Sequence, residues 1–130
     1  MPTLVVTLSH EQEPTRYALL ASALTRITAQ TLAKRAEVTV VTIHVLPTGR
    51  WYVAGQEPTR PTALLEIHVT QGTNTDQQKA EFVSTAYAEL ASQLGAADGI
   101  ELASYVVVKE VDAANWGYGG RTQKDRQQHS

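Results

Sequence analysis

Cysteine is absent from the 130-residue sequence. This absence excludes disulfide bonds, thiolate metal sites and cysteine nucleophiles, and it is compatible with a reducing compartment. An excess of charge of one sign is lacking too, because 11 basic residues nearly balance 13 acidic ones. A chain with so little net charge has no general attraction to nucleic acid or to anionic membranes, so we expect neither as a partner.

Long hydrophobic runs are also missing. The start, MPTLVVTLSHEQEP, has no basic segment that leads into an apolar run, and no stretch approaches the length of a membrane span. We therefore expect a cytoplasmic protein. The histidines lack the clustered spacing that brings three metal ligands together, so we expect no metal site, and nothing in the sequence indicates a cofactor. The four histidines are His10, His44, His68 and His129.

What the sequence does contain is an internal repeat. Residues 41–55 (VTIHVLPTGRWYVAG) align without a gap with residues 106–120 (VVVKEVDAANWGYGG), so that the two tryptophans coincide. Residues 2–8 match residues 63–69 in the same way, and both segments alternate as half-buried strands do. The residues expected on one sheet face are Leu4, Val6 and Leu8 in the first half and Leu65, Ile67 and Val69 in the second.

A helical pattern lies between the two strands of each half. In the second half, the capping box formed by Thr75 and Gln78 marks the beginning of a helix, and Gly95 is expected to end it in a left-handed conformation. In the first half, Pro14 fits an opening helical turn. The predicted apolar stripes are Leu20, Leu24 and Ile27 in the first helix and Val83, Ala86, Tyr87, Leu90 and Leu94 in the second.

Each half therefore reads strand, helix, strand, and a right-handed crossover makes the two strands parallel with the helix on one face. The halves span residues 2–56 and 62–122, and prolines in the joint favour a stiff connection. We predict a single α+β domain over residues 1–122, with a four-stranded sheet and two helices on one face. Residues 123–130 are a polar tail, which we expect to be disordered unless a neighbouring subunit orders it.

Pro2 follows Met1 directly, and removal of Met1 leaves a secondary amine at the head of a strand. Chain-terminal amines titrate at roughly 7.7–8.0, and burial disfavours the cation further, so such an amine can take a proton from carbon. Because many proteins begin with Met-Pro, the significance of Pro2 depends on the repeat that surrounds it.

The order of several motifs resembles the tautomerase superfamily over nearly the whole chain. Residues 43–47 (IHVLP) and 53–58 (VAGQEP) are similar to the middle of macrophage migration inhibitory factor, and residues 112–115 (DAAN) to part of its end. Residues 66–72 (EIHVTQG) are similar to the first strand of 4-oxalocrotonate tautomerase. Residues 115–120 (NWGYGG) are similar to the glycine-rich ending of that enzyme and, more loosely, to the ending of malonate semialdehyde decarboxylase.

The resemblance implies a homotrimer of β-α-β-β-α-β subunits with each active site at a subunit interface around the N-terminal proline. Pro2 is the matching residue and is the expected catalytic base. Its repeat partner, Ala63, has no free amine, so one site per subunit is expected. Tyr105 matches the tyrosine that lines the proline pocket from a neighbouring subunit.

The sequence departs from the family at the arginines that hold carboxylate substrates. Gln12 and its repeat partner Thr73 occupy one arginine position of 4-oxalocrotonate tautomerase, and Val40 and Tyr105 occupy the two equivalents of the other. The paired arginines of the cis-3-chloroacrylic acid dehalogenase meet Thr70 and Thr73. A dehalogenase or a decarboxylase would therefore lack its usual anion clamp.

Other basic residues are candidates to replace these arginines, although solvated surface charge is the alternative interpretation for each. Lys109 shares a strand face with Tyr105. We take Tyr105, Lys109, Gln12 and Trp116 as candidate substrate-binding residues, with subunit packing as the alternative role of the tryptophan. The candidate replacement cations are Lys34, Arg35, Arg50, Lys109 and Arg121.

The leading hypothesis for function is keto-enol tautomerisation of a small α-keto or phenylpyruvate-like acid, with Pro2 moving the proton between carbon and oxygen. One alternative is a different Pro2-dependent reaction, namely hydration, dehalogenation or decarboxylation of a small unsaturated acid. The other is a non-catalytic trimeric binding protein that keeps the scaffold without the arginines.

Overall fold

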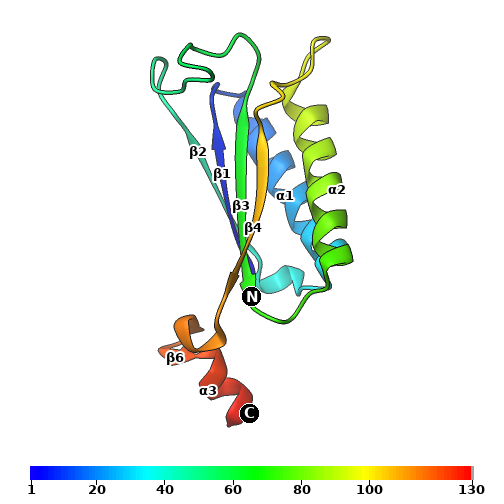
Figure 1. The fold of residues 1–130 in the computed structure, drawn as a ribbon, viewed down its shortest axis with the longest axis vertical. Helices are drawn as coiled ribbons and strands as arrows, with labels where there is room; N and C mark the ends of the chain where they lie inside the picture. Colours follow the sequence, from blue (N-terminus) through cyan, green and yellow to red (C-terminus); the bar gives the residue numbers. More distant parts are fainter. Residues whose placement is uncertain (130) are drawn as a thin grey trace.

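The computed structural model describes residues 1–129, which form a four-stranded mixed sheet with two long helices on one of its faces (Figure 1). The strand order is β2-β1-β3-β4. β1 is parallel to β2 and β3 is parallel to β4, while an antiparallel β1–β3 pair joins the two predicted halves. The elements are β1 (Thr3–Leu8), α1 (Pro14–Leu32), the 3₁₀ turn η1 (Ala36–Val38), β2 (Val40–Val45), β3 (Ala63–Thr70), α2 (Asp76–Leu94) and β4 (Tyr105–Val111).

The core lies between the sheet and the helices, and the alternation of the strands dictates which side chains enter it. In the β1–β3 pair, Leu4 lies opposite Ile67 and Val6 lies opposite Leu65, and all four side chains are buried. The two faces expected from the sequence are thus confirmed. The opposite face of the sheet has no helix over it, and Tyr105 and Val107 are exposed there.

The buried stripe of α2 differs from the predicted one at Phe82, Val83 and Tyr87. Phe82, Ala86, Leu90 and Leu94 are buried at four-residue spacing, whereas Val83 is 37% exposed. The prediction for Val83 is therefore wrong, and Tyr87 only packs against the edge of the core. The phase of the helix follows Phe82 because its ring removes more apolar area from water than a valine side chain does.

The ends of the helices are defined by caps. The capping box of Thr75 and Gln78 is present at the beginning of α2, as predicted. Gly95 follows α2 but is not left-handed, since its φ is −80°. A Cβ atom there would lie 2.7 Å from the Ala91 carbonyl oxygen and 2.9 Å from the Gly99 Cα, so close backbone approach is what requires glycine. The left-handed cap occurs instead at Ala33, after α1.

The end of the chain projects beyond the sheet, below β4 in Figure 1. It contains η2 (Ala113–Asn115), the short hairpin β5 (Gly117–Tyr118) and β6 (Arg121–Thr122), and α3 (Gln123–Gln128). Thr122 caps α3 by accepting a hydrogen bond from the Asp125 N–H. The first residues of the predicted polar tail are thus helical in the single chain, while Ser130 lies outside the described residues.

No helix within residues 1–129 has both the length and the apolar composition needed to cross a membrane.

We expect Phe82→Ala to lower the free energy of unfolding by about 3–5 kcal/mol, because it leaves a cavity between α2 and the sheet. Val83→Ala, one position along the same helix, should cost no more than about 1 kcal/mol since that side chain is partly exposed. Urea unfolding at one protein concentration measures both. Equal losses of unfolding free energy in the two variants would show that Phe82 is not buried more deeply than Val83.

Candidate active site

Pro2 is buried at the head of β1, next to the start of β2. Its carbonyl oxygen accepts a hydrogen bond of 3.2 Å from the Val40 N–H, which joins the two strands at this edge. Because β3 is antiparallel to β1, β3 and β4 finish where β1 and β2 begin. We call this edge the Pro2 end of the sheet. With Met1 in place, the ring nitrogen of Pro2 is a peptide nitrogen.

Two cations lie beside the chain terminus at the Pro2 end. The pKa of the amine at Met1 is lowered, first by burial and then by the positive charges of Lys34 and Arg35. The left-handed turn at Ala33 and the following η1 turn bring these residues back from the end of α1.

The two cations are held differently. Arg35 is paired with the Glu37 carboxylate at 2.7 Å. Lys34 is half-buried, which lowers its own pKa, and its Nζ donates to the Thr73 hydroxyl at 2.7 Å. No carboxylate within residues 1–129 forms an ion pair with Lys34. Lys34 therefore has a charge available for a ligand. The sequence marked it only as one of several replacement cations.

The C-terminal segment forms a further wall at the Pro2 end. A cavity of about 410 Å³ is lined by Met1 together with residues of the hairpin and of α3: Tyr118, Gln123, Arg126 and Gln127. Trp116 lies close by, in a second hollow that includes Thr3 at the start of β1. The structure thus brings the predicted residue Trp116 near Pro2, and it adds Gln123 and Arg126, which the sequence analysis assigned to a tail.

Lys109 is also toward the Pro2 end, but its charge is already neutralised. It lies opposite His68 in the β3–β4 pair, and His68 lies opposite Thr3. Its Nζ is 3.0 Å from a carboxylate oxygen of Glu66 on the neighbouring strand. This ion pair leaves Lys109 less suited to bind an anionic ligand than Lys34.

Tyr105 and Gln12 lie at the other end of the sheet. Tyr105 begins β4, pairs with Leu64 and is 59% exposed. Gln12 lies between β1 and α1, where its backbone N–H donates to the Tyr17 hydroxyl and its side-chain amide donates to the His10 carbonyl. Neither meets Pro2 within one chain, so contact with the Pro2 site requires a neighbouring subunit.

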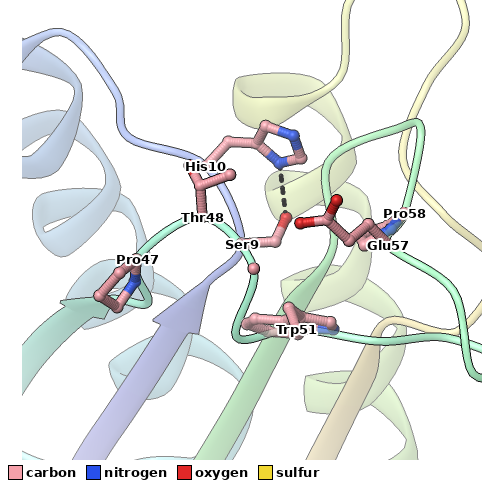
Figure 2. A pocket seen from close by; sticks show the side chains of 8 residues that line it. Ser9, His10, Pro47, Thr48, Trp51, Glu57 and Pro58 are labelled. Carbon is pink, nitrogen blue, oxygen red and sulfur yellow. Dashed lines mark hydrogen bonds between the residues drawn. The ribbon is translucent and has the colours of Figure 1, made fainter.

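The repeat counterpart of the Pro2 end is the edge where Ala63 begins β3. A small cavity of about 170 Å³ lies there. Figure 2 shows the side chains that line it, among them Ser9, His10, Trp51 and Glu57. The Ser9 Oγ lies 2.7 Å from the His10 Nδ1. Ala63 is an ordinary chain residue, so this end has no terminal amine. Within residues 1–129, no cluster of side chains has the composition of a metal site.

Comparison with known proteins identifies relatives by structure alone. No protein-family model and no curated protein matches the chain. The solved structure "native fused 4-OT" is 26% identical with a TM-score of 0.81, and the match covers 95% of this chain and 97% of that one. The "R7 fused 4-OT" asymmetric trimer is 25% identical with a TM-score of 0.84, over 96% of this chain and 98% of that one.

A more distant match has the same fold. A macrophage migration inhibitory factor-like protein from Entamoeba histolytica is 18% identical with a TM-score of 0.74, over 93% of this chain and 97% of that one. These matches span the whole β-α-β-β-α-β arrangement, so they confirm the resemblance drawn from the sequence motifs.

We expect Lys34→Ala to raise the pKa of the chain-terminal amine, because removing a nearby cation and uncovering the amine both favour its charged form. At neutral pH less of the amine is then free, so its acylation by a limiting reagent should be slower. The pH dependence of labelling, read by peptide mass spectrometry, measures this shift. Arg50→Ala, which removes a cation far from the Pro2 end, should leave the titration unchanged; the same shift in both variants would contradict the placement of Lys34.

Proposed function

The chain belongs to the tautomerase superfamily, and on this premise we propose that it is a tautomerase-like isomerase whose catalytic base is the amine of Pro2, freed by removal of Met1. Its reaction is the keto-enol tautomerisation of a small α-keto or phenylpyruvate-like acid. The reaction moves one proton and needs no redox step, so the residues of the chain are sufficient for it.

The observation that carries this proposal is the environment of the chain terminus. Pro2 is buried, and the pKa of the amine one residue ahead is lowered by burial and by Lys34 and Arg35. The same influences act on the Pro2 amine once Met1 is gone. These influences increase the fraction of the neutral secondary amine, which is the form that accepts a proton.

The chemistry follows from this placement. The Pro2 nitrogen takes the proton from the carbon next to the keto group, and the electron pair of the broken C–H bond moves to the keto oxygen as the enolate forms. The pyrrolidinium then delivers the proton to that oxygen, which gives the enol and restores the free amine. Lys34, which has a half-buried charge and no carboxylate partner within residues 1–129, stabilises the negative charge that develops on the substrate.

The proposed assembly is a homotrimer. Some fused 4-OT structures are trimers by their names, one asymmetric and another symmetric. In this chain the sheet face without helices exposes large apolar side chains, including Leu64, Tyr105 and Val107. Covering that face with neighbouring subunits buries them and brings Tyr105 and Gln12 of one subunit toward Pro2 of another, while Trp116 comes from the same chain as Pro2.

The alternatives predict different results. A hydratase, dehalogenase or decarboxylase also uses Pro2 but yields hydrated, halide-free or decarboxylated products, so product analysis distinguishes these reactions from isomerisation. A binding protein would show no turnover that depends on Pro2.

We expect the purified chain to have the mass of the sequence without Met1 and to tautomerise enols of small α-keto acids. Pro2→Ala should lower kcat/KM about 10²- to 10⁴-fold, since the replacement amine lacks the fixed position of the ring nitrogen. A chain with a residue inserted between Met1 and Pro2, chosen so that it is not cleaved, keeps the proline ring but acylates its nitrogen. This variant should be inactive.

Pro47→Ala, in the loop after β2 at the other end of the sheet, is the matched control and should retain wild-type activity. Full activity of the chain with the acylated proline would exclude the Pro2 amine as the base. Equal, slow rates for wild type and Pro2→Ala would favour the binding protein.

A further inference from the structure

The cavity beside Met1 contains an arginine whose charge no carboxylate of residues 1–129 offsets. The guanidinium of Arg126 lies 3.9 Å from the centroid of the Tyr118 ring, and its Nη2 donates to the Tyr118 carbonyl oxygen at 3.0 Å. The nearest acid along α3, Asp125, is engaged by Arg121 at 2.7 Å and faces His129 at 3.5 Å. Within residues 1–129, Arg126 forms no ion pair.

A buried glutamine with an unpartnered amide is among the residues that line the same cavity. Gln123 is 9% exposed, and its side-chain carbonyl accepts a hydrogen bond from the Thr70 hydroxyl at the end of β3. This contact turns the Nε2 group away from Thr70, and no described residue accepts a hydrogen bond from it. Buried polar groups are rarely left without partners, so this amide indicates a place where a ligand oxygen belongs.

The local fold places these two groups together. Arg126 comes three residues after Gln123 in α3, so both side chains project from the same side of the helix. Gly119, in the turn of the β5–β6 hairpin, leaves room for the guanidinium, because a Cβ atom there would lie 2.8 Å from the Arg126 Nη2. The hairpin, the helix and the Thr70 contact therefore hold an arginine and an amide donor beside the residue that precedes Pro2.

We infer that Arg126 and Gln123 form the subsite that binds the substrate carboxylate, in place of the arginines missing from the strands. A planar guanidinium binds a carboxylate through paired hydrogen bonds, and the Gln123 amide adds a donor to the same oxygens. This inference rests on the proposed function for the identity of the anion. It assigns carboxylate binding to the C-terminal segment and leaves proton transfer to Pro2.

Kinetics with two substrates test the subsite. Arg126→Gln should raise KM for an α-keto acid by roughly 10- to 100-fold, since a charge-assisted hydrogen bond is lost, and it should change kcat much less. The methyl ester of the same acid, which has no carboxylate charge, should show no such loss. Arg126→Lys keeps the charge but lacks the planar guanidinium with its paired donors. Its KM for the α-keto acid should lie between those of wild type and Arg126→Gln. Lys124→Gln removes an exposed charge from the same helix outside the cavity and should behave as wild type.

A matched glycine pair tests the position of Arg126 without changing its charge. Gly119 and Gly120 both have positive φ, 59° and 81°, so alanine strains the backbone at either position. Only the Cβ atom of Gly119→Ala meets Arg126, because nothing lies within 4 Å of the corresponding position at Gly120. Gly119→Ala should therefore weaken carboxylate binding clearly more than Gly120→Ala.

Direct binding separates this inference from the proposed function. Phenylacetate, a carboxylate with no keto group to enolise, serves as the probe in calorimetric titrations of the whole chain. If no turnover depends on Pro2 but Arg126→Gln still weakens phenylacetate binding, the proposed function fails and the subsite stands. If Arg126→Gln binds phenylacetate as wild type does, or if Lys124→Gln loses as much affinity, the subsite is overturned even where Pro2 proves catalytic.

Discussion

The antiparallel pairing of β1 with β3 is the constraint on which the rest of the structure depends. It joins two similar β-α-β halves into one sheet, with Leu4 opposite Ile67 and Val6 opposite Leu65 in the core. A shift of this register by one residue would turn every buried side chain of a strand toward the open face. The same pairing lays the head of β1 beside the end of β3, so the chain terminus and the C-terminal segment that follows β4 come to one edge.

The two edges of this repeated scaffold have different chemistry. At the Pro2 end, α1 is followed by a left-handed turn at Ala33 and then by Lys34 and Arg35. At the equivalent point after α2, Gly95 leads into a tight turn that carries Asp98 and no cation. Positive charge thus collects beside the terminal amine, whereas Arg60, the cation near Ala63, is paired with Glu101. The repeat gives both edges the same backbone arrangement. Differences in the loops after the helices favour an uncharged amine at the Pro2 end alone.

Local patterns in the sequence were sufficient for the elements but not for the details that assemble the site. Alternation gave the strand faces, and the capping box gave the beginning of α2. The buried phase of α2 depends on how Phe82 fits the sheet, which spacing alone does not specify. Pro2 was identifiable from its position, whereas α3 was assigned to a disordered tail because its anchor, the contact of Gln123 with Thr70, joins residues 53 apart in the chain.

The two cations near the terminus suit different tasks, and their separation has a physical advantage. Lys34 is a compact charge that is partly removed from water and helps to keep the amine neutral. A substrate carboxylate placed directly against Lys34 would cancel part of that charge and raise the pKa of the base when it is needed. If Arg126 holds the carboxylate instead, its own charge offsets that of the anion. The charge of Lys34 then continues to act on the amine and on the enolate oxygen.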